Sequence, residues 1–317
     1  MTKLDETSII RIFQKNLGNK KFVSEDVEVF NLDKTKFVVK TDTLVESTDI
    51  PSKMNLGDAA RKSVVACVSD FAAKGIKPQY GIISVNLPKT TSPSKIYDIA
   101  KGFRKACDEY NISILGGDTN AGKEVVFNVC IFGKTNTSIV NRKGAKNRDL
   151  IFVTGPFGYT AVGLKMVLDV KKGKKEFANK AVRSFTKPKP KLNFGLKNKK
   201  YFSSSMDSSD GLSTTLNELS RQSNKKFIIN NIPVMKDLEQ FAKSKKIDLN
   251  SLIFHGGEEY EFVFTIPSRH KKTIENNAKL FKTPIIEIGY VTLGRGVFLH
   301  DNAKEVRLKD LGWNHFR

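Results

Sequence analysis

The stretch Met206–Leu212 constrains the fold most, because it places two carboxylates three residues apart at a predicted helix start. Apolar residues recur after it at the spacing of one helix face, so Ser209 or Asp210 is the predicted N-cap. A helix start offers unpaired backbone N–H groups to an anion, while Asp207 and Asp210 offer hard oxygens to Mg²⁺. The stretch therefore predicts either a plain helix cap or a site for a metal-bound phosphate.

Length and composition limit the class of protein. A chain of 317 residues can bury a large core, and ordinary domain sizes favour two domains. Neither an apolar run of about 18 residues nor a secretory signal is present, so a cytoplasmic protein with no membrane partner is expected. Cys67, Cys107 and Cys130 are far apart within apolar segments. This spacing predicts buried thiols rather than disulfides or a C-x-x-C metal site.

The formal charge of +21 comes largely from lysine clusters. These clusters lie at 171–172, 174–175, 187–191, 199–200 and 245–246. A basic surface attracts polyanions and would help anionic nucleotides reach the protein. The clusters carry neither interleaved aromatic residues nor a recognisable nucleic-acid-binding module, so a solvated lysine-rich face is favoured over a nucleic-acid groove.

Hydrophobic periodicity predicts alternating helices and strands. In the first half, helices are expected over 7–16, 55–75 and 92–110, and strands over 36–42, 80–87, 112–115 and 125–132. A polar segment at 136–147 suggests a boundary between domains of residues 1–140 and 141–317. In the second half, strands are expected over 150–154, 227–229, 260–266, 285–291 and 297–300, and helices near 162–166, 212–219, 234–242 and 271–280. The glycine turn at 155–158 matches neither a P-loop nor a dinucleotide fingerprint.

Aspartates recur at the predicted turns, strand ends and helix ends. They are Asp26, Asp42, Asp70, Asp118, Asp207 and Asp210. Asp42 is expected at a strand end, and Asp118 follows two glycines in an expected turn. Asp70 lies near a helix end, where the macrodipole disfavours an acid, so either it is exposed to solvent or a cation is held there. Neither a Ser-His-Asp arrangement nor a zinc motif competes, so the residues predict several Mg²⁺ ions neutralising a polyphosphate during phosphoryl transfer.

Six short motifs, in this order, resemble those of the thiamine-monophosphate kinases. They are Ser24-Glu25-Asp26, Thr41-Asp42-Thr43-Leu44-Val45-Glu46, Ser69-Asp70-Phe71-Ala72-Ala73-Lys74-Gly75, Gly116-Gly117-Asp118-Thr119, Asp207-Ser208-Ser209-Asp210-Gly211-Leu212 and Gly256-Gly257-Glu258-Glu259-Tyr260-Glu261. The terminal Gly312-Trp313-Asn314-His315-Phe316 extends the resemblance over nearly the whole chain. This family is grouped with aminoimidazole ribonucleotide synthetase, selenophosphate synthetase and a hydrogenase maturation protein.

The resemblance implies a two-domain α+β fold of the aminoimidazole ribonucleotide synthetase type, with mixed sheets flanked by helices in each domain. The first domain would bind ATP and Mg²⁺ and form a homodimer, and the second would complete the phosphate and substrate site. The implied enzyme is a phosphotransferase that uses ATP to phosphorylate thiamine monophosphate directly to thiamine diphosphate, the last step of thiamine diphosphate biosynthesis. A phosphate acceptor is already largely deprotonated at neutral pH, so a catalytic base is unnecessary.

The resemblance also implies roles for individual residues. The implied Mg²⁺ ligands are Asp26, Thr41, Asp42, Asp70, Asp118, Asp207 and Asp210. Five of them are also the implied catalytic residues: Asp42, Asp70, Asp118, Asp207 and Asp210. The implied ATP contacts are Gly117, Asp118, Arg142 and Ser209. The implied contacts to thiamine monophosphate are Asp49, Glu258 and Trp313, the last by stacking on a ring.

Three positions depart from the family pattern. Glu25 replaces the first acid of the usual Gly-Asp-Asp, Lys40 stands where a serine is common, and Asp49 stands where relatives often have a histidine. The substrate pocket is therefore less well defined by the resemblance than the metal site. Lys40 puts a minor metal contact in question.

Two other functions compete with the kinase. Aminoimidazole ribonucleotide synthetase is the enzymatic alternative, but the Gly-Gly-Glu-Glu-Tyr-Glu turn at 256–261 and the end of the chain favour the thiamine kinase. Selenophosphate synthetase would need a reactive Cys near the N-terminus, and the hydrogenase maturation protein would need a terminal one. A basic nucleic-acid-binding protein would use the lysine clusters and leave the acids unexplained.

Overall fold

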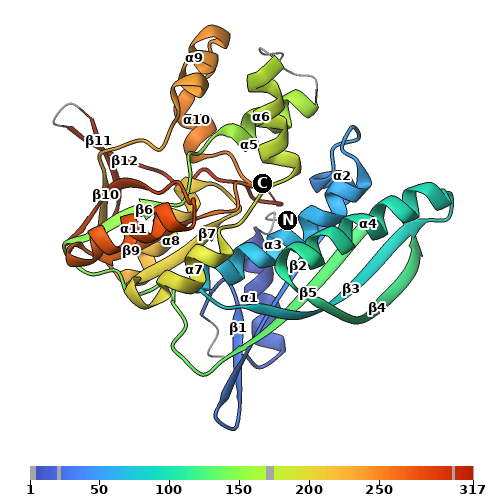
Figure 1. Cartoon of the computed structure of the whole chain (residues 1–317). Helices are drawn as coiled ribbons and strands as arrows, with labels where there is room; N and C mark the ends of the chain where they lie inside the picture. The colour runs from blue at the N-terminus through green and yellow to red at the C-terminus, as the bar shows by residue number, and fades with distance from the viewer. Residues whose placement is uncertain (1–4, 20–22, 169–174, 302–303, 317) are drawn as a thin grey trace.

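Two mixed sheets organise the computed structural model, which describes residues 5–19, 23–168, 175–301 and 304–316 (Figure 1). The first sheet contains, in spatial order, β1 (Glu28–Leu32), β2 (Thr35–Val45), β5 (Val126–Thr135), β3 (Pro78–Pro88) and β4 (Ser113–Gly122). The second contains β12 (Lys304–Arg307), β11 (Gly296–Asp301), β8 (Lys226–Ile229), β10 (Ile286–Thr292), β6 (Asp149–Val153), β9 (Glu261–Pro267) and β7 (Ser204–Ser208). The β3–β4 and β8–β11 pairs are parallel and the other pairs antiparallel, so the prediction of mixed sheets is confirmed.

Helices flank both sheets. In the first half they are α1 (Glu6–Asn16), α2 (Glu46–Asp49), α3 (Leu56–Lys74) and α4 (Pro93–Tyr110). In the second half they are α5 (Tyr159–Val167), α6 (Lys175–Thr186), α7 (Leu192–Asn198), α8 (Leu212–Ser223), α9 (Lys236–Lys245), α10 (Leu249–Phe254) and α11 (Lys271–Leu280). The lysines at 171, 172 and 174 lie outside the described residues. No helix in the described ranges is both long and apolar enough to cross a membrane.

Helix α3 lies between the two halves of the molecule (Figure 1). Asn55 caps it, since its side-chain oxygen accepts hydrogen bonds from the backbone N–H groups of Gly57 and Asp58, at 2.8 and 3.2 Å. Gly75 ends it in the left-handed conformation, with φ of 63°. Nearly every residue between is buried, as expected for a helix enclosed on all sides. The predicted helix and both of its end signals are confirmed.

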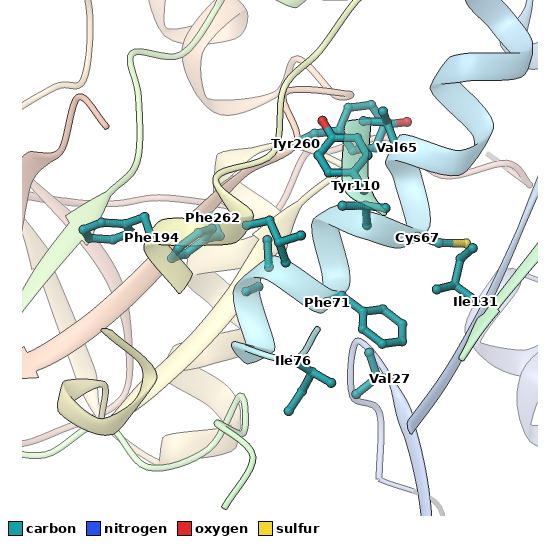
Figure 2. Packing of buried hydrophobic residues seen from close by; sticks show 14 of the residues in the cluster. Val27, Val65, Cys67, Phe71, Ile76, Tyr110, Ile131, Phe194, Tyr260 and Phe262 are labelled. Carbon is teal, nitrogen blue, oxygen red and sulfur yellow. The ribbon is translucent and has the colours of Figure 1, made fainter. Parts of the chain in front are cut away.

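The core around α3 contains side chains from both halves of the chain. Figure 2 shows Phe71 near Val27 and Ile131 of the first half, with Phe194 and Phe262 of the second half on the other side of the helix. The two sheets themselves divide cleanly, one before residue 136 and one after 148. The division into residues 1–140 and 141–317 remains a prediction, because one continuous core spans it.

One expected strand end and one expected turn lie within strands in the structure. β2 continues beyond Asp42 to Val45, so Asp42 is not at a strand end. β4 continues through Gly117 and Asp118, which pair in register with Ile83 and Ser84 of β3. A Cβ on Gly117 would lie 1.7 Å from the carbonyl oxygen of Ile83. The glycine therefore permits close approach of a neighbouring strand rather than a turn.

The segment between β7 and α8 also differs from the prediction. α8 begins after Gly211, whose φ is 113°, and neither Ser209 nor Asp210 caps it with a side chain. Backbone contacts hold this segment instead: Ser209 accepts from the N–H of Glu258 at 2.5 Å, and Asp210 from that of Trp313 at 2.9 Å. These two loops fix the segment, so the N-cap prediction is wrong. Of the cysteines, Cys67 and Cys107 are buried as predicted, whereas Cys130 is half-buried.

Candidate functional site

A cavity of about 500 Å³ is lined by residues from both halves of the chain. Eight of the residues predicted for the site line it: Asp42, Asp49, Asp70, Asp207, Ser209, Asp210, Glu258 and Trp313. They come from β2, α2, α3, β7 and the loops that follow β7, α10 and β12. Helix α3 supplies one wall, so the most buried helix of the described chain also positions a carboxylate in the cavity.

Three buried aspartates form a cluster, and two of them, Asp70 and Asp207, also line the cavity. Asp26 precedes β1, Asp70 lies on α3 and Asp207 on β7, and carboxylate oxygens from the three lie within 4.8 Å of one another. Their residues are only 1%, 3% and 4% exposed, so exposure to solvent does not explain Asp70. Such a set of hard oxygen donors fits Mg²⁺, because a divalent cation would offset the cost of burying several carboxylates together.

The pKa shifts of these carboxyls reflect burial and mutual repulsion. Burial raises the pKa of Asp207 to about 7, and the adjacent Asp26 carboxylate adds to the rise. The pKa of Asp70 is raised well above its usual range, first by burial and then by Asp207. Burial also opposes ionisation of Asp26, but Lys74 and Arg142 outweigh it and lower the pKa of that carboxyl. The negative charges of Asp70 and Asp207 are therefore less well compensated by nearby cations than the charge of Asp26.

Two cations already fix Asp26. The Arg142 Nε donates to one carboxylate oxygen at 2.6 Å, and the Lys74 Nζ lies 3.0 Å from the other. Glu25 holds the same two residues: its carboxylate is 2.8 Å from Lys74 Nζ and accepts from the backbone N–H of Arg142 at 3.0 Å. Glu25, one of the departures from the family pattern, is thus a structural partner of both cations. Arg142, an expected ATP contact, is engaged with Asp26 and does not line the cavity.

Lys40 brings a third cation to the carboxylates. Its Nζ lies 3.1 Å from Asp70 Oδ2 and 3.4 Å from Asp42 Oδ1. Burial opposes its charge, but Asp70 and Asp42 raise the pKa of Lys40 well above its usual range, so it stays protonated. Lys40 and Asp42 share one face of β2 because side chains alternate along a strand. Thr41 between them is exposed and does not line the cavity, so the structure does not bring this predicted ligand to the site.

Lys62 is a functional neighbour that the sequence reading missed. It is fully buried on α3, with its Nζ 2.5 Å from Glu258 Oε1 and 3.9 Å from the centroid of the Phe185 ring. Glu258 has φ of 63°, an uncommon conformation for a residue with a side chain. The backbone and the ion pair together orient Glu258 at the cavity. A lysine within the apolar face of a predicted core helix was the available signal.

The loop after β7 places Asp210 in the cavity. Burial raises the pKa of Asp210 to about 6, and the charge of Glu6 adds to the rise. The same cavity is also lined by apolar and aromatic groups, including Leu164, Phe185 and Trp313. A cavity lined both by carboxylates and by apolar and aromatic groups suits a ligand that carries phosphates and an organic ring.

Gly117 and Asp118 lie away from this cavity in the single chain. Both are exposed on β4, at the edge of the first sheet, and the Asp118 carboxylate accepts a hydrogen bond from Asn120 Nδ2 at 2.6 Å. They are not among the described residues that line the cavity. Two of the predicted ATP contacts are therefore not brought together with the remaining acids by one chain.

Comparison with known proteins places these observations in a family. The family described as AIR synthase related protein, N-terminal domain, matches residues 24–135. A solved structure described as AaThiL complexed with AMPPCP and TMP has a TM-score of 0.88 and 27% identity, over 100% of this chain and 98% of the other. A crystal structure of thiamine monophosphate kinase from Aquifex aeolicus has a TM-score of 0.82 and 26% identity, over 94% and 97%.

The sequence similarity to a curated relative is higher still. The thiamine-monophosphate kinase of Nitrosopumilus maritimus is 66% identical over 317 residues, covering 100% of both chains. This full-length match points to the same family as the sequence motifs, several of which line the cavity. The resemblance inferred from those motifs is confirmed. The chain belongs to the thiamine-monophosphate kinase family.

Proposed function

We propose that this chain transfers the γ-phosphoryl group of ATP to the phosphate of thiamine monophosphate, yielding thiamine diphosphate and ADP. The observation that carries the proposal is a cavity lined both by buried carboxylates and by aromatic side chains, in a chain 66% identical to a thiamine-monophosphate kinase. The solved structure of AaThiL complexed with AMPPCP and TMP, which is 27% identical to this chain, supports the same pair of substrates.

The reaction needs positioning rather than a catalytic base. An oxygen of the acceptor phosphate attacks the γ-phosphorus, a new phosphorus–oxygen bond forms, and the bond to the β,γ-bridging oxygen breaks to release ADP. The second pKa of a phosphate ester is about 6, so the acceptor is mostly ionised at neutral pH. Bringing two polyanions together is the main electrostatic barrier, and the site must supply positive charge.

Mg²⁺ held by the acids would supply that charge to the phosphate oxygens. The residues that we propose as its ligands are Asp26, Thr41, Asp42, Asp70, Asp118, Asp207 and Asp210. Asp70 and Asp207 are the strongest candidates, since each is buried and has its pKa raised by burial. Thr41 is a weaker one, because its side chain is on the other face of β2.

The remaining roles follow from the cavity. We propose Ser209, Arg142, Gly117 and Asp118 as ATP contacts, and Asp49, Glu258 and Trp313 as contacts to thiamine monophosphate. Trp313 offers an aromatic face to a cationic ring, and Glu258 stands at the cavity wall, oriented by Lys62. The Asp49 carboxylate accepts from the backbone N–H of Val45 at 2.8 Å, which fixes α2 beside the site.

We further infer that the active enzyme is a homodimer. Tyr80, Ile82, Ile114 and Leu115 of β3 and β4 leave apolar surface exposed at the sheet edge that also carries Asp118. Exposed strand edges and apolar patches favour pairing with another chain. A second copy covering this edge would bring Gly117 and Asp118 to a shared site.

A direct assay tests the reaction. The protein is incubated with ATP, Mg²⁺ and thiamine monophosphate, and thiamine diphosphate is measured by chromatography. Product well above a no-enzyme control is expected. Absence of product from protein that is folded by circular dichroism would reject the proposed function.

Amide substitutions test the acids. Asp207→Asn and Asp210→Asn should each lower turnover by roughly 100-fold or more, because each removes a negative oxygen from the proposed metal site without changing side-chain size. Asp108→Asn is the matched control, since Asp108 is exposed and pairs with Arg104 on the surface. Unchanged turnover in both site variants would remove these residues from the mechanism.

A further inference from the structure

The Lys40 ammonium bridges two of the acids that we propose as metal ligands, Asp42 and Asp70. Its ammonium is within 3.4 Å of two carboxylates, from β2 and from α3, and its side chain is only 24% exposed. An ion pair on a protein surface exchanges freely with water, whereas this one faces a cluster of buried acids. The group therefore acts as a fixed positive charge of the site.

Three other cations near the site are paired with other acids. Lys74 and Arg142 both pair with Asp26, Lys74 also pairs with Glu25, and Lys62 pairs with Glu258. This leaves Asp42, Asp70 and Asp207, which together carry three negative charges when ionised, with Lys40 as the cation that contacts two of them. The trio and Lys40 thus keep two uncompensated negative charges, the charge of one divalent ion. Without Lys40 the same trio would keep three.

We propose that the Lys40 ammonium permanently takes the place of one divalent cation in this site, so that the chain binds one Mg²⁺ fewer than its carboxylates could hold. The inference rests on the proposed function insofar as the acids are taken to bind a divalent metal. Lys40 is then a positioning residue for Asp42 and Asp70 even in the absence of metal. A protonated amine cannot leave the site by dissociation, so this part of the charge is independent of the Mg²⁺ concentration.

Counting bound Mn²⁺ tests the proposal without any substrate. Free Mn²⁺ is measured by electron paramagnetic resonance during titration of the wild-type chain and of Lys40→Met. Lys40→Met should bind one more Mn²⁺ per chain than wild type. Lys40→Arg, which keeps the charge, and Lys34→Met, which removes an exposed lysine from the β1–β2 turn, should bind the wild-type number.

The outcomes separate this inference from the function on which it rests. If wild type binds Mn²⁺ and Lys40→Met binds the same number, the inference is wrong while the metal chemistry stands. If neither binds Mn²⁺, both the inference and the metal part of the proposed function fail. Kinase activity is measured separately, so loss of turnover in Lys40→Met does not decide the question.

A second measurement on the wild-type chain covers the case in which Lys40→Met does not fold. Lysines are reductively methylated with and without Mn²⁺, and each site is quantified by mass spectrometry. Lys40 should remain poorly labelled relative to Lys34 in both conditions, since its ammonium stays between Asp42 and Asp70. A rise in Lys40 labelling on adding Mn²⁺ would mean that the metal displaces it, and would overturn the inference.

Discussion

Buried carboxyl groups should make the folding stability of this chain depend on pH. Besides the acids of the cavity, Glu259 is almost fully buried, and one of its oxygens accepts from the backbone N–H of Gly158 at 2.5 Å. Burial raises the pKa of Glu259 to about 8, against 4.5 for an ordinary glutamate. The folded chain therefore holds a proton that the unfolded chain releases at much lower pH.

The sign of the effect on stability follows from that proton. Between about pH 4.5 and 8 the folded state binds more protons at Glu259 than the unfolded state, so stability falls as pH rises, by at most about 1.4 kcal/mol per pH unit. Glu259→Gln should reduce the loss of stability with rising pH. Glutamine keeps a side-chain oxygen to accept the hydrogen bond from Gly158, but it does not ionise. Urea unfolding at pH 5.5 and 8 measures it, with exposed Glu239→Gln as control. Equal slopes for wild type and Glu259→Gln would contradict the prediction.

For single residues, the sequence predicts the acids of the site better than the lysines that pair with them. The motifs at 69–75 and 207–212 identified Asp70 and Asp207, and their placement in one cavity agrees with the expectation. Lys62 and Lys74 were missed because a lysine's partner lies far away along the chain, and its ion pair cannot be read from spacing. Lys40 was noticed only as a departure from a pattern, although its ammonium lies within 3.4 Å of two of the site's carboxylates.

Helices and strands approach one another closely where glycines permit it. A Cβ added to Gly195 of α7 would lie 2.0 Å from the carbonyl oxygen of Ala72 on α3. The contact joins a helix of the second half to the helix that carries Asp70. Packing of α7 on α3 therefore depends on the absence of a side chain at this position.

Gly195→Ala should lower the free energy of unfolding by roughly 1–2 kcal/mol. The clash with backbone costs about 1–3 kcal/mol or more, and it outweighs the gain of about 1 kcal/mol that alanine brings to a helix interior. Urea denaturation measures the change. Asn193→Ala, at an exposed position of α7, should change stability by less than about 0.5 kcal/mol. A Gly195→Ala chain as stable as wild type would show that α7 can move away from α3 without cost.

Helices and strands were predicted well where the hydrophobic periodicity was strong. They were predicted poorly where glycines were taken as turn residues from the neighbouring sequence alone. The helix at 55–75 and the strand at 125–132 needed only their apolar spacing and end signals. The glycines at 116–117 predicted a turn, but Gly117 is required for another reason, the close pairing of β4 with β3. That requirement comes from a strand about 30 residues earlier, which local turn preferences do not include.

The whole molecule is two sheets held around one helix, with an exposed apolar edge on the first sheet. Leu115 of β4 is 66% exposed. Leu115→Glu should convert the proposed homodimer to a monomer, because the substitution places charges at the edge that a second copy would cover. Sedimentation velocity measures the mass, and turnover should fall with it if Asp118 serves a shared site.

Leu293→Glu provides the control for that experiment. Leu293 is 70% exposed in the turn after β10, far along the chain from the sheet edge, and its substitution should leave the mass unchanged. If Leu115→Glu sediments like wild type, this edge is not the subunit interface. The sequence could only imply a dimer through its resemblance, since a surface becomes recognisable as an edge once strand order is known.

The buried cluster of three aspartates also bears on folding. Asp26, Asp70 and Asp207 are distant in sequence, so they come together only after both sheets have docked on α3. A partly synthesised or partly unfolded chain offers no such cluster to a cation. Divalent metal should consequently favour the completed fold over every intermediate, and fragments that retain one sheet should bind the metal more weakly than the complete chain.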